Sequence, residues 1–191
     1  MPLRMMTLAT SGRRFMGSIL PLAVFLLVPS LAHAASGEIV PALGITKPVD
    51  GGDAKMSGNL ALRGHPLPML MTEIGAGYRT ESRFDDQLKV RQWPITASLY
   101  LSPPNSIVYG GAGVGWYHST FDYAETTGIP DETKQQFGVH LGGGFQVPLG
   151  EKAGVDLNGR YVMLRDQQSH LIPEKFNPNF WTTQLGLSFR F

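Results

Sequence analysis

Residues 181–191 alternate strictly between two kinds of side chain. One set is apolar apart from Thr183 and comprises Trp181, Thr183, Leu185, Leu187, Phe189 and Phe191, whereas the residues between them are polar or glycine. Successive side chains of a β-strand point to opposite faces, so this period of two predicts an amphipathic strand. Its length suits a tilted strand that crosses a lipid bilayer, which needs roughly 9–11 residues.

The same period recurs upstream. Seven further stretches alternate in this way: residues 38–46, 56–63, 69–80, 91–101, 107–118, 135–148 and 155–164. The clearest is 135–148, where Phe137, Val139 and Leu141 share one face and Gly138 and His140 share the other. Together with the C-terminal stretch, the pattern predicts eight strands.

The connections between these strands carry a second pattern. In chain order they are residues 47–55, 64–68, 81–89, 102–106, 119–134, 150–154 and 165–179, which alternate between long and short. Membrane barrels have an even number of strands, short periplasmic turns and long external loops. A soluble sandwich could also hold eight amphipathic strands, but it gives no reason for this alternation of lengths. We therefore predict an all-β fold, an eight-stranded antiparallel transmembrane β-barrel in an up-and-down meander, with both termini in the periplasm.

Tryptophan placement supports the membrane interpretation. Trp93, Trp116 and Trp181 all fall at the predicted outer ends of their strands. Trp93 and Trp181 share the apolar face, and Trp116 shares it if its neighbours such as Val114 face outward. Such a set is typical of the aromatic girdle of a lipid-facing surface. We expect Phe189 and Phe191 at the opposite, periplasmic rim, together with Tyr109. Core aromatics at strand ends are the alternative.

The N-terminus has the organisation of a secretory signal peptide. Arg4, Arg13 and Arg14 precede an apolar stretch at 15–31, and Ala32-His33-Ala34 fits the small-x-small cleavage pattern. We predict cleavage after Ala34, with residues 1–34 as signal peptide and 35–191 as one barrel domain. The alternative is a membrane anchor, which the prolines in the apolar stretch and the adjoining cleavage pattern disfavour.

Composition excludes several function classes. Removal of the three leader arginines leaves 13 basic and 15 acidic residues. The remaining chain therefore lacks the excess of positive charge that nucleic-acid-binding proteins carry. The chain holds no cysteine, which excludes disulfides and thiol chemistry. No apolar run after the leader approaches the roughly 18 residues of a membrane helix.

Glycine-rich strands carry a resemblance to a known family. Residues 110–117, and with them 137–144, 154–161 and 186–191, resemble the strands of the outer membrane protein β-barrel domain family, the OmpA/OmpW-like small porin-family barrels. The resemblance implies a bacterial outer-membrane location and contact with outer-membrane lipid. It also implies that Leu187, Phe189 and the terminal Phe191 are the signal read by the barrel assembly machinery.

Polar residues on the predicted inward faces form the first candidate site. They include Glu73, Arg79, Asp156, Arg160 and Arg190. Side chains nearly fill an eight-stranded barrel, and charges inside it should be paired because isolated buried charges are costly. We expect a structural, hydrogen-bonded plug. The alternative is a narrow porin-like path for small or hydrophobic solutes.

Catalytic, cofactor and metal sites have little support. The five histidines are His33, His65, His118, His140 and His170, and no HxH or HExxH spacing joins them, so we expect neither a metal nor a cofactor. Some small outer-membrane barrels are lipid A deacylases. His118-Ser119 is the nearest local candidate here, but it lacks their His-x-Ser spacing and their late-strand position. We therefore predict a non-enzymatic protein, with a lipid-modifying enzyme as a further alternative. The acidic loop within 119–134 is a possible external contact.

Overall fold

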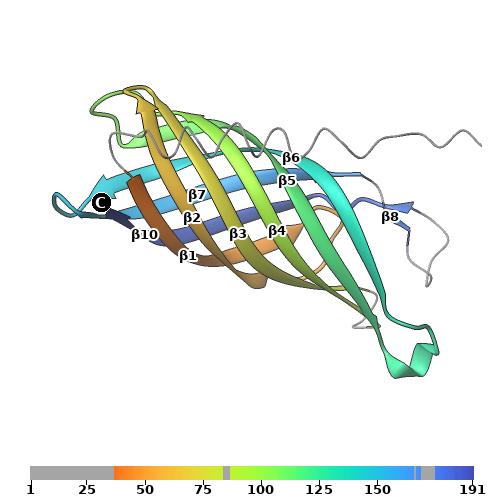
Figure 1. Ribbon diagram of the computed structural model, residues 1–191. Helices are drawn as coiled ribbons and strands as arrows, with labels where there is room; N and C mark the ends of the chain where they lie inside the picture. The colour runs from red at the N-terminus through yellow and green to blue at the C-terminus, as the bar shows by residue number, and fades with distance from the viewer. Residues whose placement is uncertain (1–36, 84–86, 166, 169–174) are drawn as a thin grey trace, which may run out of the picture.

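Eight long strands form a closed antiparallel barrel in the computed structural model, which describes residues 37–83, 87–165, 167–168 and 175–191 (Figure 1). The strands are β1 (Gly37–Pro48), β2 (Lys55–Leu67), β3 (Leu70–Arg83), β4 (Leu88–Leu101), β5 (Val108–Tyr123), β6 (Glu132–Pro148), β7 (Ala153–Leu164) and β10 (Phe180–Arg190). Each strand pairs with the next along the chain, and β10 pairs with β1. The predicted meander barrel is therefore confirmed.

Three short elements lie in the connections. A 3-10 helix, η1 (Glu125–Thr127), follows β5, and the two-residue strands β8 (Gln167–Gln168) and β9 (Lys175–Phe176) pair with each other between β7 and β10. No helix among the described residues is long and apolar enough to cross a membrane.

The two ends of the barrel differ. β1 begins where β10 ends, and Gly37 and Phe191 exchange backbone hydrogen bonds of 3.1 and 3.0 Å there. We call this the terminal end and the opposite one the loop end (Figure 1). The predicted cleavage after Ala34 lies outside the described residues and stays a prediction.

The wall separates an apolar exterior from a polar interior, as the alternation predicts. The outward side chains of Leu43, Ile95 and Leu185 are 66%, 60% and 60% exposed, whereas the inward Glu73 and Asp156 are each 1% exposed. This is the reverse of a soluble protein. An apolar outer surface of this kind is stable when lipid surrounds it, since a closed wall pairs backbone polar groups between neighbouring strands.

The interior is so narrow that some inward positions must be glycine, because a side chain from a neighbouring strand lies against the backbone there. Gly113 on β5 faces inward, where an added Cβ would collide with the imidazole of His140 and with the backbone carbonyl of Ala97. Gly144 on β6 likewise leaves room for the phenol of Tyr109. The glycine-rich strands thus make space for larger inward side chains on neighbouring strands.

Proline interrupts the wall at one place that borders the interior. The β3–β4 ladder pairs Ala76 with Ile95 and then Arg79 with Gln92, and omits the pairs at Pro94 and the adjacent Trp93. Proline has no N–H to donate to a ladder. Two ladder pairs are therefore missing between β3 and β4, as they are between β1 and β10 at Val40 and Pro41.

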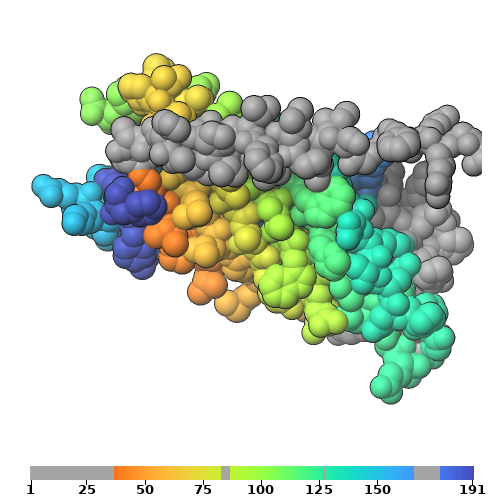
Figure 2. Space-filling model, viewed as in Figure 1, coloured from red at the N-terminus to blue at the C-terminus, as the bar shows by residue number. Residues whose placement is uncertain are grey.

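The predicted strict alternation of connection lengths is wrong. Residues 84–87 join β3 to β4 at the loop end, whereas residues 102–107 form a longer turn at the terminal end. The predicted loops 81–89 and 119–134 are partly strand, because β3–β4 pairing continues to Arg83 and β5–β6 pairing begins at Phe121 and Glu132. Beyond the lipid the alternation is reversed, because apolar residues such as Val90 and Phe121 are buried inside and polar residues such as Lys89 and Asp122 face outward. Figure 2 shows the β5–β6 extension projecting beyond the rest of the wall.

Candidate functional site in the barrel lumen

Arg63 on β2 is the centre of the lumen network. Its Nε donates to Oε2 of Glu73 at 2.8 Å, and its Nη1 donates to Oδ2 of Asp156 at 2.6 Å. Its Nη2 reaches the hydroxyl of Tyr109 at 3.1 Å, and that hydroxyl in turn donates to Asp156 at 2.9 Å. The side chains of Arg63 and Glu73 are 1% and 0% exposed, so this is a fully buried charge cluster.

Arg160 joins this cluster from the other side of the barrel. Its Nη2 donates to Oε1 of Glu73 at 2.7 Å, and its Nε donates to Asn158 at 2.7 Å. In the barrel order, β7 with Arg160 and β3 with Glu73 lie directly opposite each other. The Arg160–Glu73 bond therefore spans the lumen.

A second polar group lies toward the terminal end. Arg190 on β10 donates to Glu38 on β1 at 2.9 Å, and Gln146 on β6 donates to the other oxygen of Glu38 at 2.6 Å. Because β1 and β6 are not neighbours, the Gln146–Glu38 bond also crosses the interior.

A third group lies toward the loop end. Arg79 on β3 donates to Gln92 at 2.6 Å and to Glu81 at 3.0 Å, and Gln92 donates to Ser119 at 2.7 Å. The guanidinium of Arg79 lies 3.7 Å from the ring centroid of Phe180 on β10, across the lumen. At that distance the ring face stabilises the cation.

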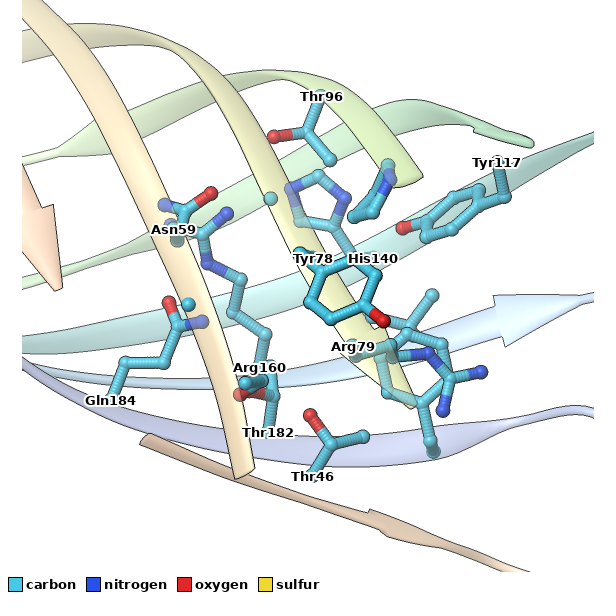
Figure 3. Close-up of a pocket in the computed structure, with 16 residues that line it drawn as sticks. Thr46, Asn59, Tyr78, Arg79, Thr96, Tyr117, His140, Arg160, Thr182 and Gln184 are labelled. Carbon is cyan, nitrogen blue, oxygen red and sulfur yellow. The ribbon is translucent and has the colours of Figure 1, made fainter. Parts of the chain in front are cut away.

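A small cavity separates the central cluster from the group around Arg79. It has a volume of about 50 Å³ and is lined by side chains from strands all around the barrel (Figure 3). His140 on β6 lies beside it and forms a hydrogen bond of 2.9 Å between Nε2 and the hydroxyl of Ser98. Room of this size suits a few water molecules or one small ion, and no organic solute.

The predicted interior residues all take inward positions. Glu73 and Arg160 meet directly, Asp156 joins them through Arg63, and Arg79 and Arg190 belong to the groups on either side. Two residues of the lumen network were not predicted from the sequence. Arg63, the last residue of the predicted strand 56–63, is absent from the predicted interior set, and Tyr109 is predicted at the periplasmic rim.

The prediction for Tyr109 is wrong, because its side chain is 4% exposed and bonded to Asp156. The signal was present in the sequence. Val108 and Val114 face outward at 46% and 38% exposure, so every odd-numbered residue of β5 must face inward.

The aromatic residues at the loop end pair on the outer surface. Trp93 lies 4.4 Å from Tyr78 and Trp181 lies 4.5 Å from Tyr161, measured between ring centroids. Trp116 has the outward parity of its strand, cross-strand from Ile95. The positions are those a girdle requires, and the girdle role stays a prediction.

The C-terminal residues also lie on the outside. Leu187 and Phe189 are 50% and 44% exposed on the lipid face, and Phe191 is 79% exposed at the terminal end. Their predicted role as an assembly signal needs such exposure, and it stays a prediction.

At the loop end of β4 and β5, the extended strands form a small apolar core of their own. Leu88, Val90, Phe121 and Tyr123 pack together with Ile129. We call this the loop-end extension. On its outer side, Asp122 accepts hydrogen bonds from Arg91 and so raises the pKa of that guanidinium. The hydroxyl of Tyr123 donates to Glu132 at 3.0 Å, which ties β5 to β6.

The structure does not bring together the two residues of the catalytic candidate His118-Ser119. His118 and Ser119 are consecutive in β5, so they face opposite sides of the wall, and Ser119 is 0% exposed in the lumen. The hydrogen-bonded pair Ser98 and His140 is likewise enclosed inside the barrel. Within the described ranges, no three His, Cys, Asp or Glu side chains gather as metal ligands do. His33 and His170 lie outside the described residues.

A closed strand wall with an apolar exterior and an ion-paired interior defines a transmembrane β-barrel of the outer-membrane class. The chain belongs to the outer membrane protein beta-barrel domain family, whose model matches residues 19–191. The resemblance drawn from the glycine-rich strands is thereby confirmed, and the family indicates the bacterial outer membrane as the location.

Solved structures share the fold at low identity. Neisserial surface protein A aligns at a TM-score of 0.62 with 14% identity, over 82% of this chain and 96% of that one. OprG from Pseudomonas aeruginosa gives 0.53 and 18%, over 83% and 97%. Ail, the attachment invasion locus protein of Yersinia pestis, solved with the heparin analogue sucrose octasulfate, gives 0.51 and 18%, over 82% and 97%. No curated protein matches the chain.

Proposed function

We propose that this chain is a non-enzymatic outer-membrane barrel whose lumen is closed by its own side chains and whose loop-end extension contacts external molecules. The observation that carries closure is the buried Arg160–Glu73 bond of 2.7 Å between opposite strands, reinforced by the Arg63–Asp156 bond of 2.6 Å. A solute that passes must separate these charges. Breaking a buried ion pair costs about 3–5 kcal/mol, so the paired state dominates at rest.

The loop-end extension supports the contact role. Its apolar core around Phe121 holds the projecting strands in one arrangement, while Lys89, Arg91 and Asp122 lie on the solvent side. A preorganised projection loses less conformational entropy on binding than an unstructured loop does. This arrangement favours recognition by shape and charge outside the membrane.

Liposome swelling tests closure. Liposomes that contain the refolded protein should swell in glycerol or small sugars no faster than protein-free liposomes, whereas liposomes with a 16-stranded porin swell rapidly. Swelling above the protein-free rate, in a preparation that migrates as folded protein on a gel without heating, would refute the closed lumen.

A second candidate is a narrow path for small or hydrophobic solutes, which the interrupted ladder at Pro94 favours. The interruption lies beside the lumen cavity, because Pro94, Gly77 and Tyr78 line that cavity. A wall that parts there would connect the lumen with the membrane. The cavity of about 50 Å³ is too small for an organic solute at rest, so this path requires opening.

Pro94→Val discriminates between the two candidates, since valine restores the missing N–H and favours a strand. Cells would be compared for uptake of an apolar dye that fluoresces inside the membrane. The path predicts faster uptake with the wild-type protein and a loss of that gain with Pro94→Val. The closed barrel predicts equal uptake with wild type, variant and no protein.

A further inference from the structure

The lumen cavity contains more unpaired polar atoms than any other part of the described barrel. The hydroxyls of Ser57, Thr96 and Thr182 and Nδ1 of His140 have no hydrogen-bond partner among the described residues. All four residues line the cavity and are at least nine-tenths buried, with exposures of 6%, 9%, 8% and 1%. Buried polar groups are rarely left unpaired, so four that converge on one space indicate a bound ligand.

The lining supplies hydrogen-bond donors. Three of the four groups are hydroxyls, and the neutral ring of His140 carries its proton on Nδ1 when Ser98 donates to Nε2. Arg160 also lines the space, and its Nη2 and Nε donate to Glu73 and Asn158.

The charged side chains among the described residues that line the cavity are two guanidinium groups, each paired with a carboxylate. They belong to Arg79 and Arg160, and no carboxylate of the described residues is part of the lining. Their carboxylate partners, Glu81 and Glu73, lie outside the lining. A site of low dielectric with two guanidinium groups and several neutral donors favours an anion over a neutral molecule.

We propose that this cavity binds one small monovalent inorganic anion, such as chloride or bromide. Its volume of about 50 Å³ suits an anion of this size better than phosphate esters or other large ligands. Ser57, Thr96, Thr182 and His140 donate hydrogen bonds to the anion, and Arg79 and Arg160 supply positive charge beside it. Bound there, the anion links β2, β4, β6, β7 and β10 across the lumen.

Bromide diffraction tests the proposal directly. Crystals of the refolded full chain would be soaked in sodium bromide and measured at the bromine absorption edge. We expect an anomalous peak inside the cavity, within hydrogen-bond reach of Arg160 and Thr182. Density without an anomalous signal means that water alone fills the cavity, and it would overturn the proposal.

Thermal unfolding provides a second test with matched variants. Sodium bromide would be compared with sodium gluconate at the same concentration, because gluconate is too large for the cavity. At about ten times the dissociation constant, bromide should raise Tm by roughly 3–6 °C. Ser57→Ala and Thr182→Val should each lower this rise by at least half.

Ser188→Ala is the matched control. Ser188 also lies on β10, is 0% exposed and has an unpaired hydroxyl among the described residues, but it does not line the cavity. This variant should keep the full bromide effect. An equal effect in all variants would be a general salt effect and would refute the site.

Discussion

Glu73→Gln removes the charge that joins two arginines across the lumen. Oε1 of Glu73 accepts from Arg160 at 2.7 Å, and Oε2 accepts from Arg63 at 2.8 Å. Glutamine keeps the shape but turns an NH₂ group toward one guanidinium. Arg63 retains Asp156, whereas Arg160 retains only the neutral Asn158 among the described residues. The variant therefore leaves a buried charge without its counter-ion.

The expected loss of stability is large. Removing one partner of a buried pair costs about 3–5 kcal/mol. For a domain of this size each kcal/mol shifts Tm by about 2–4 °C, so Tm should fall by roughly 6–20 °C. The assay is the temperature at which the folded, fast-migrating gel band converts to the unfolded band, supported by a urea titration in the same detergent.

Two comparisons make the result specific. Asp122→Asn breaks the exposed Arg91–Asp122 pair, whose arginine side chain is 47% exposed, and should change Tm little. Glu73→Leu combined with Arg160→Met removes both charges and should be more stable than Glu73→Gln alone. If Glu73→Gln unfolds at the wild-type temperature, or if the double variant is the least stable, the buried pair does not hold the lumen together.

Three further predictions concern other parts of the barrel. Gly113→Ala should lower Tm, because its Cβ would collide with His140, whereas Gly150→Ala, with open space around it, should not; equal effects would contradict the packing argument. Deleting Phe191, which is 79% exposed, should leave refolding in detergent unchanged but reduce the amount of protein in the outer membrane of cells, and normal levels would count against an assembly signal. In single-tryptophan variants, bromines near the lipid headgroups should quench Trp93, Trp116 and Trp181 more than bromines at the acyl-chain ends, and the reverse order would exclude a girdle.

The strand pattern was predictable because lipid imposes it. Along β6 and β10 every second residue must be apolar where the wall meets acyl chains, so the faces of Phe137, Leu141 and Leu185 follow from parity alone. The constraint stops where the lipid stops. Lys89 and Asp122 are paired residues of β4 and β5 on the outer face, whereas Leu88, Val90 and Phe121 are buried inside, so the apolar face there is the opposite of the lipid-facing one.

The lumen contacts were only partly predictable. Parity places Arg63, Glu73 and Arg160 inside, but it does not say which of them lie at the same height. That depends on the stagger of the strands around the barrel, which one sequence without its pairing register leaves open. Arg63 is the centre of the network because the strand register places Arg63 on β2, Glu73 on β3 and Asp156 on β7 at the same height along the barrel axis.

Electrical conductance is the most direct test of a lumen closed by its own side chains. The refolded protein would be inserted into a planar bilayer, with the unheated gel band as proof of folding. The Arg63–Glu73–Arg160 cluster predicts no discrete current steps from the wild-type protein. Reproducible steps of one size from a fully folded preparation would contradict the closed lumen and favour a solute path.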